Sequence, residues 1–208
     1  MLFTSEQVSC GHPDKICDQI ADAVLTDCLR HDPESRVAIE CLIKDNVIVL
    51  AGELTSEHMP DTDALAHEVL RRIGVPESES YESAAFITRQ SRDIARGVDR
   101  GGAGDQGMMY GYATDETPEL MPLPFMLATR ALLALRDLHS SLLLPDAKAQ
   151  VTYDYEAGRI DTFLISTQHR ADVHTVQVKV IVHGIMAQVA EAYSLNTDFR
   201  AMVNPTGR

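Results

Sequence analysis

The stretch from residue 36 to residue 55 constrains the fold most, because apolar and polar side chains alternate along it around a short turn. Apolar side chains occupy every second position from Val37 to Ile43, and a second apolar-rich stretch follows over residues 47–55. The intervening Asp45-Asn46 is typical of a tight turn. The pattern predicts an antiparallel hairpin. A two-residue turn pairs Lys44 with Val47, Glu40 with Ala51, and Ala38 with Glu53.

This register places two carboxylates, Glu40 and Glu53, on one face of the hairpin. Like charges in diagonal positions are unfavourable unless a cation or a ligand ammonium group lies near them. The alternative is a pair of solvated carboxylates on an exposed face. The hairpin taken alone favours that alternative, since most acidic side chains are exposed.

Four segments are predicted to be helices from the spacing of their apolar side chains. In the first, residues 13–29, Ile16, Ile20, Val24 and Cys28 recur at helical spacing. The others are residues 61–73, 125–138 and 173–193, the last despite several β-branched side chains. Further strands are predicted at residues 84–88, 150–155 and 160–166, the last two as a hairpin. The mixed order indicates an α+β or two-layer α/β fold.

Charge and cysteine spacing narrow the function classes. With a formal net charge of −13, the chain has no basic patch to neutralise a nucleic-acid backbone, so no nucleic-acid partner is expected. No apolar run approaches the roughly 18 residues of a membrane span, and the first residues do not resemble a signal peptide. The four cysteines form no CxxC pair, which is typical of a reducing compartment. A cytoplasmic protein without a membrane partner is expected.

The segment Gly11-His12-Pro13-Asp14-Lys15 gathers an imidazole, a carboxylate and an ammonium group where the first helix should begin. Pro13 suits the first helical turn. His12 is therefore expected beside the positive end of a helix, a place that favours anions. A single His or Asp at such a position is more often an ordinary cap. Taken together, the residues outline a phosphate-handling site.

Seven segments that follow one another along the whole chain resemble the S-adenosylmethionine synthetase (methionine adenosyltransferase) family. They are Thr4-Ser5-Glu6, Gly11-His12-Pro13-Asp14-Lys15, Gly97-Val98-Asp99, Gly104-Asp105-Gln106-Gly107, Tyr112-Ala113-Thr114-Asp115-Glu116-Thr117, Pro145-Asp146-Ala147-Lys148 and Asn204-Pro205-Thr206-Gly207-Arg208. The resemblance implies two similar α/β units, each a sheet with helices on one side. An amino-terminal domain would occupy residues 1–100 and end in a mobile loop, and a central domain would occupy residues 101–208.

The resemblance also implies a reaction. In this family the methionine sulfur attacks the ribose C5′ of ATP, the triphosphate leaves, and water then cleaves it to diphosphate and phosphate. No side chain needs to act as a nucleophile, because the sulfur already is one. The protein has to align sulfur with C5′ and to supply positive charge for the departing triphosphate.

Roles for single residues follow from the same resemblance. His12 and Lys148 would be catalytic, with His12 near the bond that breaks. Asp14 would bind Mg²⁺ and Glu40 would help to hold K⁺. The ATP-binding set would be His12, Lys15, Asp146, Ala147, Lys148 and Arg208.

The methionine site gives the hairpin carboxylates a use. Glu53 would bind the methionine ammonium group, and Gln90 and Asp105 would lie near the polar end of methionine. Residues 89–107, which contain five glycines and no regular pattern, are predicted to form a long loop. Loops of this length are usually functional. As the family's mobile loop it would include Gln90, Asp93, Gly97, Asp99 and Gly101.

The chain also departs from the family pattern. Family members are longer, with a third domain that brings further lysines, an aspartate and an arginine to the substrates. The loop is shorter here after Asp99, and Cys10, Arg92 and Thr129 replace a common glutamate, proline and histidine. The triphosphate leaving group carries about four negative charges, and few positively charged side chains are available here to balance them.

Three hypotheses follow. In the first, the chain is an adenosyltransferase subunit for ATP and L-methionine, completed by a partner chain that carries the third domain. It would act in a homo-oligomer, dimer or tetramer, or in a hetero-oligomer. In the second, it is a non-catalytic regulatory or structural paralogue that binds nucleotide or a full-length enzyme. In the third, it is a small triphosphatase that uses the metal half of the site.

Overall fold

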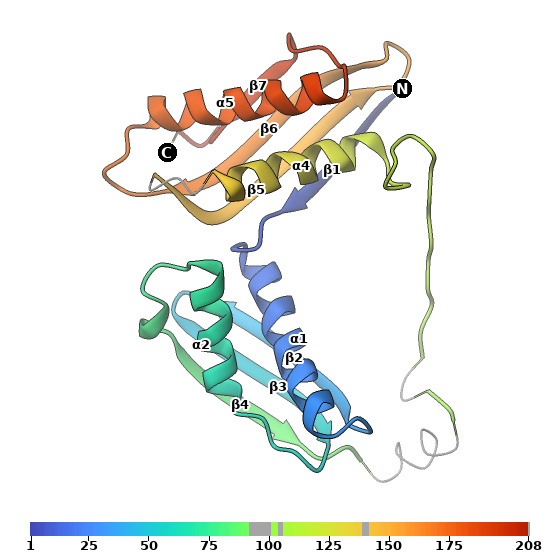
Figure 1. Cartoon of the computed structure of the whole chain (residues 1–208), viewed down its shortest axis with the longest axis vertical. Helices are drawn as coiled ribbons and strands as arrows, with labels where there is room; N and C mark the ends of the chain where they lie inside the picture. Colours follow the sequence, from blue (N-terminus) through green and yellow to red (C-terminus); the bar gives the residue numbers. More distant parts are fainter. Residues whose placement is uncertain (92–100, 104–105, 139–141, 208) are drawn as a thin grey trace. The chain divides into compact units, whose positions relative to one another are not determined.

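The computed structural model describes residues 1–91, 101–103, 106–138 and 142–207, and it divides into two compact units (Figure 1). The four-stranded unit comprises Met1–His12 and Tyr112–Arg208, and the three-stranded unit comprises Pro13–Gly111. Both are sheets with helices on one side, as expected of two similar α/β units. The first strand of the chain belongs to the four-stranded unit, so the structural division differs from a simple split near residue 100.

The three-stranded unit begins with a helix and continues with the predicted hairpin. Its sheet has the order β2-β3-β4, with β2 and β3 antiparallel and β4 parallel to β3. The predicted hairpin register is confirmed, since Lys44 pairs with Val47, Glu40 with Ala51, and Ala38 with Glu53. The elements are α1 (Pro13–His31), β2 (Arg36–Lys44), β3 (Val47–Thr55), α2 (Thr62–Ile73), the short 3₁₀ helix η1 (Ser78–Ser80) and β4 (Glu82–Thr88).

The apolar positions that predicted α1 form the core of this unit. Ile20, Val24 and Cys28 are fully buried against Ile48 and Leu50 of β3. Burial of such side chains contributes about 1.5–3 kcal/mol each, which outweighs the modest helix propensity of valine and isoleucine. One face of the sheet is thereby covered by α1 and α2, and the other face stays open.

The four-stranded unit repeats this order and adds a strand. Its sheet has the order β1-β5-β6-β7, with β6 and β7 parallel and the other neighbours antiparallel. Helices α4 and α5 pack on one face, around the buried Phe163. The elements are β1 (Leu2–Val8), α4 (Leu123–Asp137), β5 (Leu143–Asp154), β6 (Arg159–His169), α5 (Thr175–Ala192) and β7 (Arg200–Val203).

Helix α5 forms despite its β-branched residues because packing and capping favour it. Val178 and Val182 are buried against the sheet. At its start, the His174 side chain accepts from the Val176 N–H, and the Gln177 side chain accepts from the His174 N–H. Among the described residues, no helix combines the length and the apolar character that a membrane span requires.

Candidate active site

A cavity of about 340 Å³ lies in the four-stranded unit and gathers four of the residues predicted to bind ATP. Its volume falls within the roughly 300–1,000 Å³ of small-molecule sites. Two of the four, His12 and Lys148, carry or can carry positive charge. The lining residues are His12, Asp146, Ala147, Lys148, Ser166, Thr167, Gln168, Asn204 and Thr206.

A serine and a glycine bring His12 to this cavity. The Ser9 hydroxyl donates to the Pro145 carbonyl oxygen at 2.6 Å and accepts from the Ala147 N–H at 2.7 Å, so it fastens the end of β1 to the start of β5. At Gly11 an added Cβ would lie 2.5 Å from the backbone carbon of Pro145. Only glycine allows this approach without a shift of the backbone. The segment before His12 is therefore held closely against the strand that carries Asp146.

Asp146 lies partly buried in the cavity wall. Burial raises the pKa of its carboxyl group, and the nearby His12 opposes that shift. A carboxylate that is poorly solvated favours ligands that donate hydrogen bonds to it. Asp146 is thus suited to accept from an N–H or O–H group of a bound molecule.

Lys148 forms an ion pair with Glu6 of β1, with 2.8 Å between its Nζ and Oε1 of Glu6. This hydrogen bond lowers the pKa of Glu6. Both side chains are about half exposed, at 43% and 52%. Exposed pairs contribute only about 0–1 kcal/mol, so an anionic ligand can replace Glu6 as the partner of Lys148 at little cost.

Asn204 lines the cavity and continues the pairing of β6 with β7 through its side chain. Its Oδ1 accepts from the Thr167 N–H at 2.8 Å, and its Nδ2 donates to the Thr167 carbonyl oxygen at 3.0 Å. The chain then turns, and the Gly207 N–H donates to the Asn204 carbonyl oxygen. Asn204 therefore holds both Thr167 and the turn with Thr206 at the cavity.

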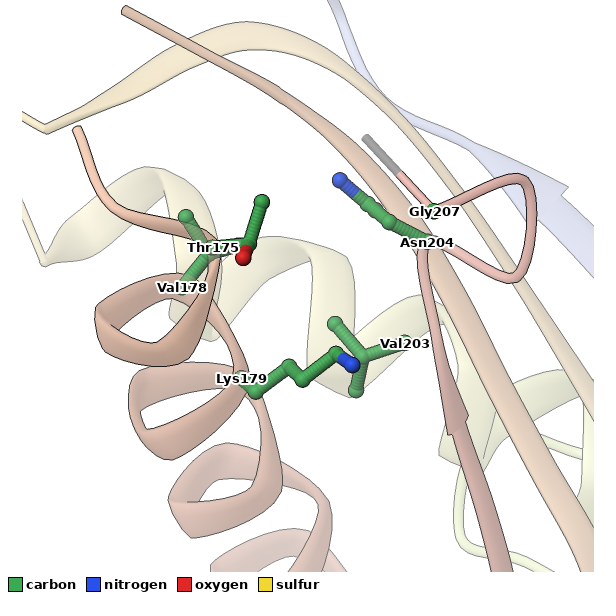
Figure 2. A pocket seen from close by; sticks show the side chains of 6 residues that line it. All are labelled: Thr175, Val178, Lys179, Val203, Asn204 and Gly207. Atoms are coloured by element: carbon green, nitrogen blue, oxygen red, sulfur yellow. The ribbon is translucent and has the colours of Figure 1, made fainter. Parts of the chain in front are cut away.

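A second, much smaller hollow of about 10 Å³ lies where α5 begins and β7 ends (Figure 2). Its lining includes Thr175, Lys179 and Asn204. A volume of this size admits about one water molecule, so it is no substrate site. Figure 2 shows the Lys179 side chain reaching from α5 toward Val203 of β7.

The other predicted residues that the structure describes lie in the three-stranded unit. Asp14 is exposed in the first turn of α1, and Lys15 is paired with Asp18, with 2.8 Å between Nζ and Oδ2. An exposed carboxylate in a first turn fits Mg²⁺, which is usually held by one or two carboxylates together with phosphate oxygens and water. Asp14 is thus a suitable residue for that ion.

Glu40 and Glu53 lie on the sheet face that the helices leave open. Glu40 is exposed on β2, and Glu53 is half-buried on β3 opposite Ala38. Glu53 also pairs with Thr88, the last residue of β4, so the chain reaches Gln90 at the same end of the sheet. The Gln90 Oε1 atom is buried and has no hydrogen-bond partner among the described residues. Glu40 offers the kind of oxygen ligand that suits K⁺, and the structure brings Glu53 and Gln90 to the same end of the sheet.

Two family models together match nearly the whole chain. The model for the S-adenosylmethionine synthetase N-terminal domain matches residues 1–92, and the model for the central domain of that family matches residues 100–208. This chain belongs to the S-adenosylmethionine synthetase family. An S-adenosylmethionine synthase from Sorangium cellulosum (strain So ce56) is 42% identical over 227 residues, covering 99% of this chain and 54% of that protein. The chain spans about half the length of this curated relative.

Five of the predicted site residues lie outside the residues that the structure describes. They are Asp93, Gly97, Asp99, Asp105 and Arg208. Gly101 is described, and its φ of 84° is one that glycine adopts readily.

One family motif has a structural role. Within the segment from Tyr112 to Thr117, the Glu116 carboxylate accepts from the Tyr155 hydroxyl at 2.6 Å and from the Leu123 N–H at 3.1 Å. Burial and the hydrogen bond with Glu116 raise the pKa of Tyr155. Glu116 therefore fixes the start of α4 to the end of β5.

Sequence reasoning missed five polar residues of the S-adenosylmethionine synthetase cavity. Gly11, Asn204 and Thr206 belong to motifs that resemble the family, so the sequence marked their segments as important. It did not indicate what each of these residues does. The missed residues are Ser166, Thr167, Gln168, Asn204 and Thr206, and among these only Asn204 and Thr206 carried any signal in the sequence. Ser9, which positions the cavity wall without lining it, was missed as well.

Proposed function

We propose that this chain is a methionine adenosyltransferase subunit, which converts ATP, L-methionine and water to S-adenosylmethionine, phosphate and diphosphate. The observation that carries the proposal is the cavity of about 340 Å³ in which His12, Asp146 and Lys148 converge. Family membership supplies the reaction class, and the cavity supplies groups suited to a nucleotide with an anionic tail.

His12 and Lys148 act on the triphosphate. Lys148 exchanges Glu6 for phosphate oxygens. The loss of the Lys148–Glu6 ion pair costs little free energy because both side chains are about half exposed. His12 donates a hydrogen bond to an oxygen near the C5′–O bond, where negative charge grows as that bond breaks. Stabilising this developing charge is worth about a hundredfold to a thousandfold in rate for a single donor.

Asp146 and Ala147 orient the nucleoside part. The raised pKa of Asp146, which burial causes, reflects a carboxyl group that lacks solvent. It gains a hydrogen-bond donor when a nucleoside N–H or O–H group enters. Ala147 is small and buried, so the strand backbone can lie close to the ligand.

Two cations and a methionine complete the proposal. Asp14 holds Mg²⁺, which when bound neutralises phosphate charge, and Glu40 helps to hold K⁺. Lys15 and Arg208 add positive charge to the ATP site. Glu53 binds the methionine ammonium group, and Gln90 and Asp105 bind its polar end. In this proposal Gln90 and Gly101 would belong to the family's mobile loop together with Asp93, Gly97 and Asp99, which lie outside the described residues.

We further propose that the chain acts in an oligomer and that a partner chain supplies the family's third domain. The open face of the three-stranded sheet supports a protein partner, because Leu42 and Phe86 are 63% and 66% exposed there. Apolar patches of this kind usually mark interfaces. A cytoplasmic location, suggested by the cysteine spacing, remains part of the proposal.

A second function, nucleotide binding without catalysis, is favoured by the small number of cations. Among the described residues that line the cavity, only His12 and Lys148 can carry positive charge. A chain of this kind would regulate a full-length enzyme. A phosphatase that cleaves triphosphate without methionine is distinguished by its product.

The test is incubation of the purified chain with ATP, methionine, Mg²⁺ and K⁺, followed by mass-spectrometric detection of S-adenosylmethionine, beside His12→Ala. The same assay is repeated with the carboxy-terminal half of the Sorangium cellulosum relative added as a separate chain. Product that disappears in His12→Ala supports the enzyme. ATP binding without product under either condition favours the regulatory protein, and phosphate from triphosphate alone favours the phosphatase.

A further inference from the structure

Three residues of the three-stranded unit bring metal-binding side chains together, apart from every residue assigned to the substrates. Asp27 and His31 lie four residues apart near the end of α1, so they share one face of the helix. His58 lies in the connection between β3 and α2. One ligand atom from each of the three lies within 4.8 Å of the others.

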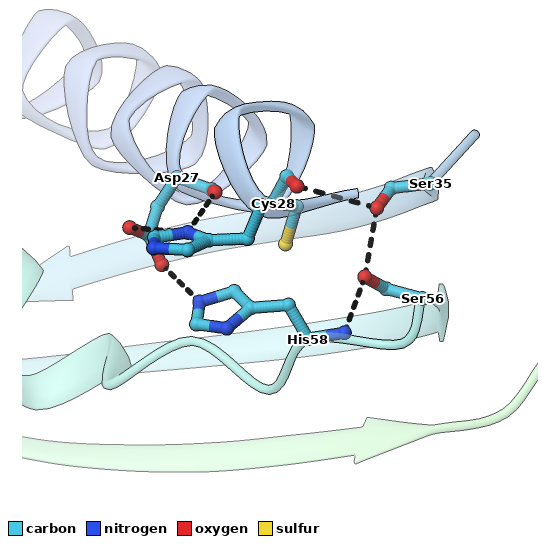
Figure 3. A network of polar contacts seen from close by, with 6 residues as sticks. Asp27, Cys28, Ser35, Ser56 and His58 are labelled. Carbon is cyan, nitrogen blue, oxygen red and sulfur yellow. Dashed lines mark hydrogen bonds and ion pairs between the residues drawn. The ribbon is translucent and has the colours of Figure 1, made fainter. Parts of the chain in front are cut away.

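The contacts within this cluster orient both imidazoles around Asp27 and leave the Nε2 lone pair of His31 for a metal ion. His31 Nδ1 lies 2.9 Å from the Asp27 carbonyl oxygen, and because a carbonyl only accepts, Nδ1 carries the proton and Nε2 keeps its lone pair. Metal-binding histidines typically donate their other nitrogen to a carbonyl in this way. His58 Nε2 lies 2.7 Å from Asp27 Oδ2 (Figure 3). Because a carboxylate only accepts, this nitrogen donates in the metal-free chain, and an ion that binds both groups releases the proton to solvent. The two imidazole rings are stacked, with 4.0 Å between centroids.

A network of hydrogen bonds holds His58 in place. The His58 N–H donates to the Ser56 hydroxyl at 3.0 Å, and the Ser35 hydroxyl donates to the same oxygen at 2.7 Å (Figure 3). The neighbouring Glu57 N–H donates to Asp32 Oδ2 at 2.9 Å. The segment that carries His58 is thereby fastened to the turn that follows α1, so the ligands are ordered before a metal arrives.

A second Asp–His pair in the same unit, Asp63 and His67, provides a comparison for the pair formed by Asp27 and His31. In α2, His67 Nδ1 lies 3.0 Å from the Asp63 carbonyl oxygen, as His31 does relative to Asp27. The other nitrogen of His67 lies 3.1 Å from the Tyr81 carbonyl oxygen. Both nitrogens of His67 are therefore directed at backbone carbonyl oxygens, and, among the described residues, no second imidazole lies beside them in this cluster of contacts. His67 is a matched control.

We propose that Asp27, His31 and His58 bind a divalent transition-metal ion, for which Zn²⁺ is the best fit. Two imidazoles and one carboxylate are a common zinc ligand set, with water in the fourth position. Ligand atoms around tetrahedral zinc lie about 3.4 Å apart, so the Asp27–His58 contact opens only slightly. The side chains of Asp27 and His58 are 24% and 28% exposed, which leaves the ion a path from solvent. The ion joins the end of α1 to the connection before α2.

The test is calorimetric titration of the full chain with Zn²⁺ in a buffer that contains Mg²⁺ to fill the exposed carboxylate sites. One ion should bind per chain. His58→Ala and Asp27→Asn should each weaken binding by at least about tenfold to a hundredfold, and His67→Ala should leave it unchanged. His58→Gln, which keeps a hydrogen-bonding side chain, replaces His58→Ala should that variant fail to fold.

Titration with Co²⁺ identifies the ligands independently of affinity. A spectrum without a thiolate charge-transfer band is expected, since the cluster offers only nitrogen and oxygen. A thiolate band would assign the ion to cysteines and overturn the proposal. So would the absence of one-to-one binding, or equal affinity in the wild type and His58→Gln. None of these results depends on adenosyltransferase activity, because the cluster contains no residue of the proposed substrate site.

Discussion

The two units follow the same order of elements and differ at one edge of the sheet. Each consists of a helix, a hairpin, a second helix and a strand parallel to the second hairpin strand, as α1-β2-β3-α2-β4 and α4-β5-β6-α5-β7. In the four-stranded unit, β1 pairs with β5, whereas β2, the counterpart of β5, is an edge strand in the order β2-β3-β4. The added strand brings Ser9, Gly11 and His12 against β5. The cavity therefore arises where the topology departs from the repeat.

The open faces of the two sheets differ as well. On β5 the residues between the buried positions are Lys148, Gln150 and Thr152, so that face is polar. On the three-stranded sheet the open face includes Leu42 and Phe86, which are largely exposed. One architecture thus presents a polar open face in one unit and an open face with exposed apolar side chains in the other.

The largest effect is expected from the lysine that lines the cavity. Lys148→Ala should weaken binding of tripolyphosphate with Mg²⁺ by about tenfold to a hundredfold, since a hydrogen bond to a charged group contributes about 1.5–3 kcal/mol. The matched control is Lys44→Ala, which removes an exposed lysine paired with Asp45 at 2.6 Å in the other unit. Calorimetry measures both. Equal weakening by the two variants would mean that general charge, and not the cavity, binds the anion.

The next effect comes from two glycines, one in each unit, that lie close to the backbone of a neighbouring segment. Gly11→Ala places a Cβ 2.5 Å from the Pro145 backbone, and Gly52→Ala places one 2.0 Å from the Ala38 oxygen. Each should lower the free energy of unfolding by about 1–3 kcal/mol. Gly184→Ala, in a helix where nothing lies within 4 Å, should instead raise it by about 0.5–1 kcal/mol.

Hydrogen exchange sharpens this second prediction. Gly11→Ala should reduce protection in β1, β5 and β6, and Gly52→Ala should reduce it in β2 and β3. Loss of protection throughout the chain from either variant would show that the units unfold together, and the comparison of two separate cores would then fail.

The hairpin was predictable because its signals are local. Alternation over nine residues and a two-residue turn fix which residues pair, and the structure confirms that register in full. By contrast, β1 was not predicted. Its sequence from Leu2 to Val8 does not alternate, and only its pairing with β5, far along the chain, makes it a strand. The same holds for the four-residue β7, whose place depends on β6.

The cavity was predictable only in part, for a related reason. His12, Asp146 and Lys148 stand in long motifs, and the structure brings all three to one cavity. Ser9 and Thr167 could not be found, because a lone hydroxyl residue has no sequence signal for the strand that it will contact. Tertiary pairing decides which polar side chains meet, and periodicity does not record it.

A smaller effect is expected from two aspartates with opposite shifts. Burial raises the pKa of Asp146, so its ionisation costs folding free energy above the raised value, and Asp146→Asn should stabilise the ligand-free chain at neutral pH. Hydrogen bonds from Asn196 and then Arg159 lower the pKa of Asp198, so Asp198→Asn should destabilise it at the same pH.

Urea denaturation measures both aspartate variants, and calorimetry with ATP should show weaker binding for Asp146→Asn alone. A chain that loses stability in Asp146→Asn would contradict the burial argument. It would indicate that the carboxylate already has a favourable partner in the free protein.

The smallest effect is expected from the protonation of His67 in the three-stranded unit. The Asp63 carbonyl oxygen, then the Asp63 carboxylate and the Tyr81 carbonyl oxygen, raise the pKa of His67 above its ordinary value. The stability that protonated His67 contributes is therefore complete below the pKa of the unfolded state, about 6.5. It is lost as pH rises through the higher pKa of the folded state. Urea denaturation at about pH 6 and about pH 8 should show a larger loss in the wild type than in His67→Gln. Hydrogen exchange should confine that difference to α2 and β4, and an equal change in the four-stranded unit would show that the two units share their stability.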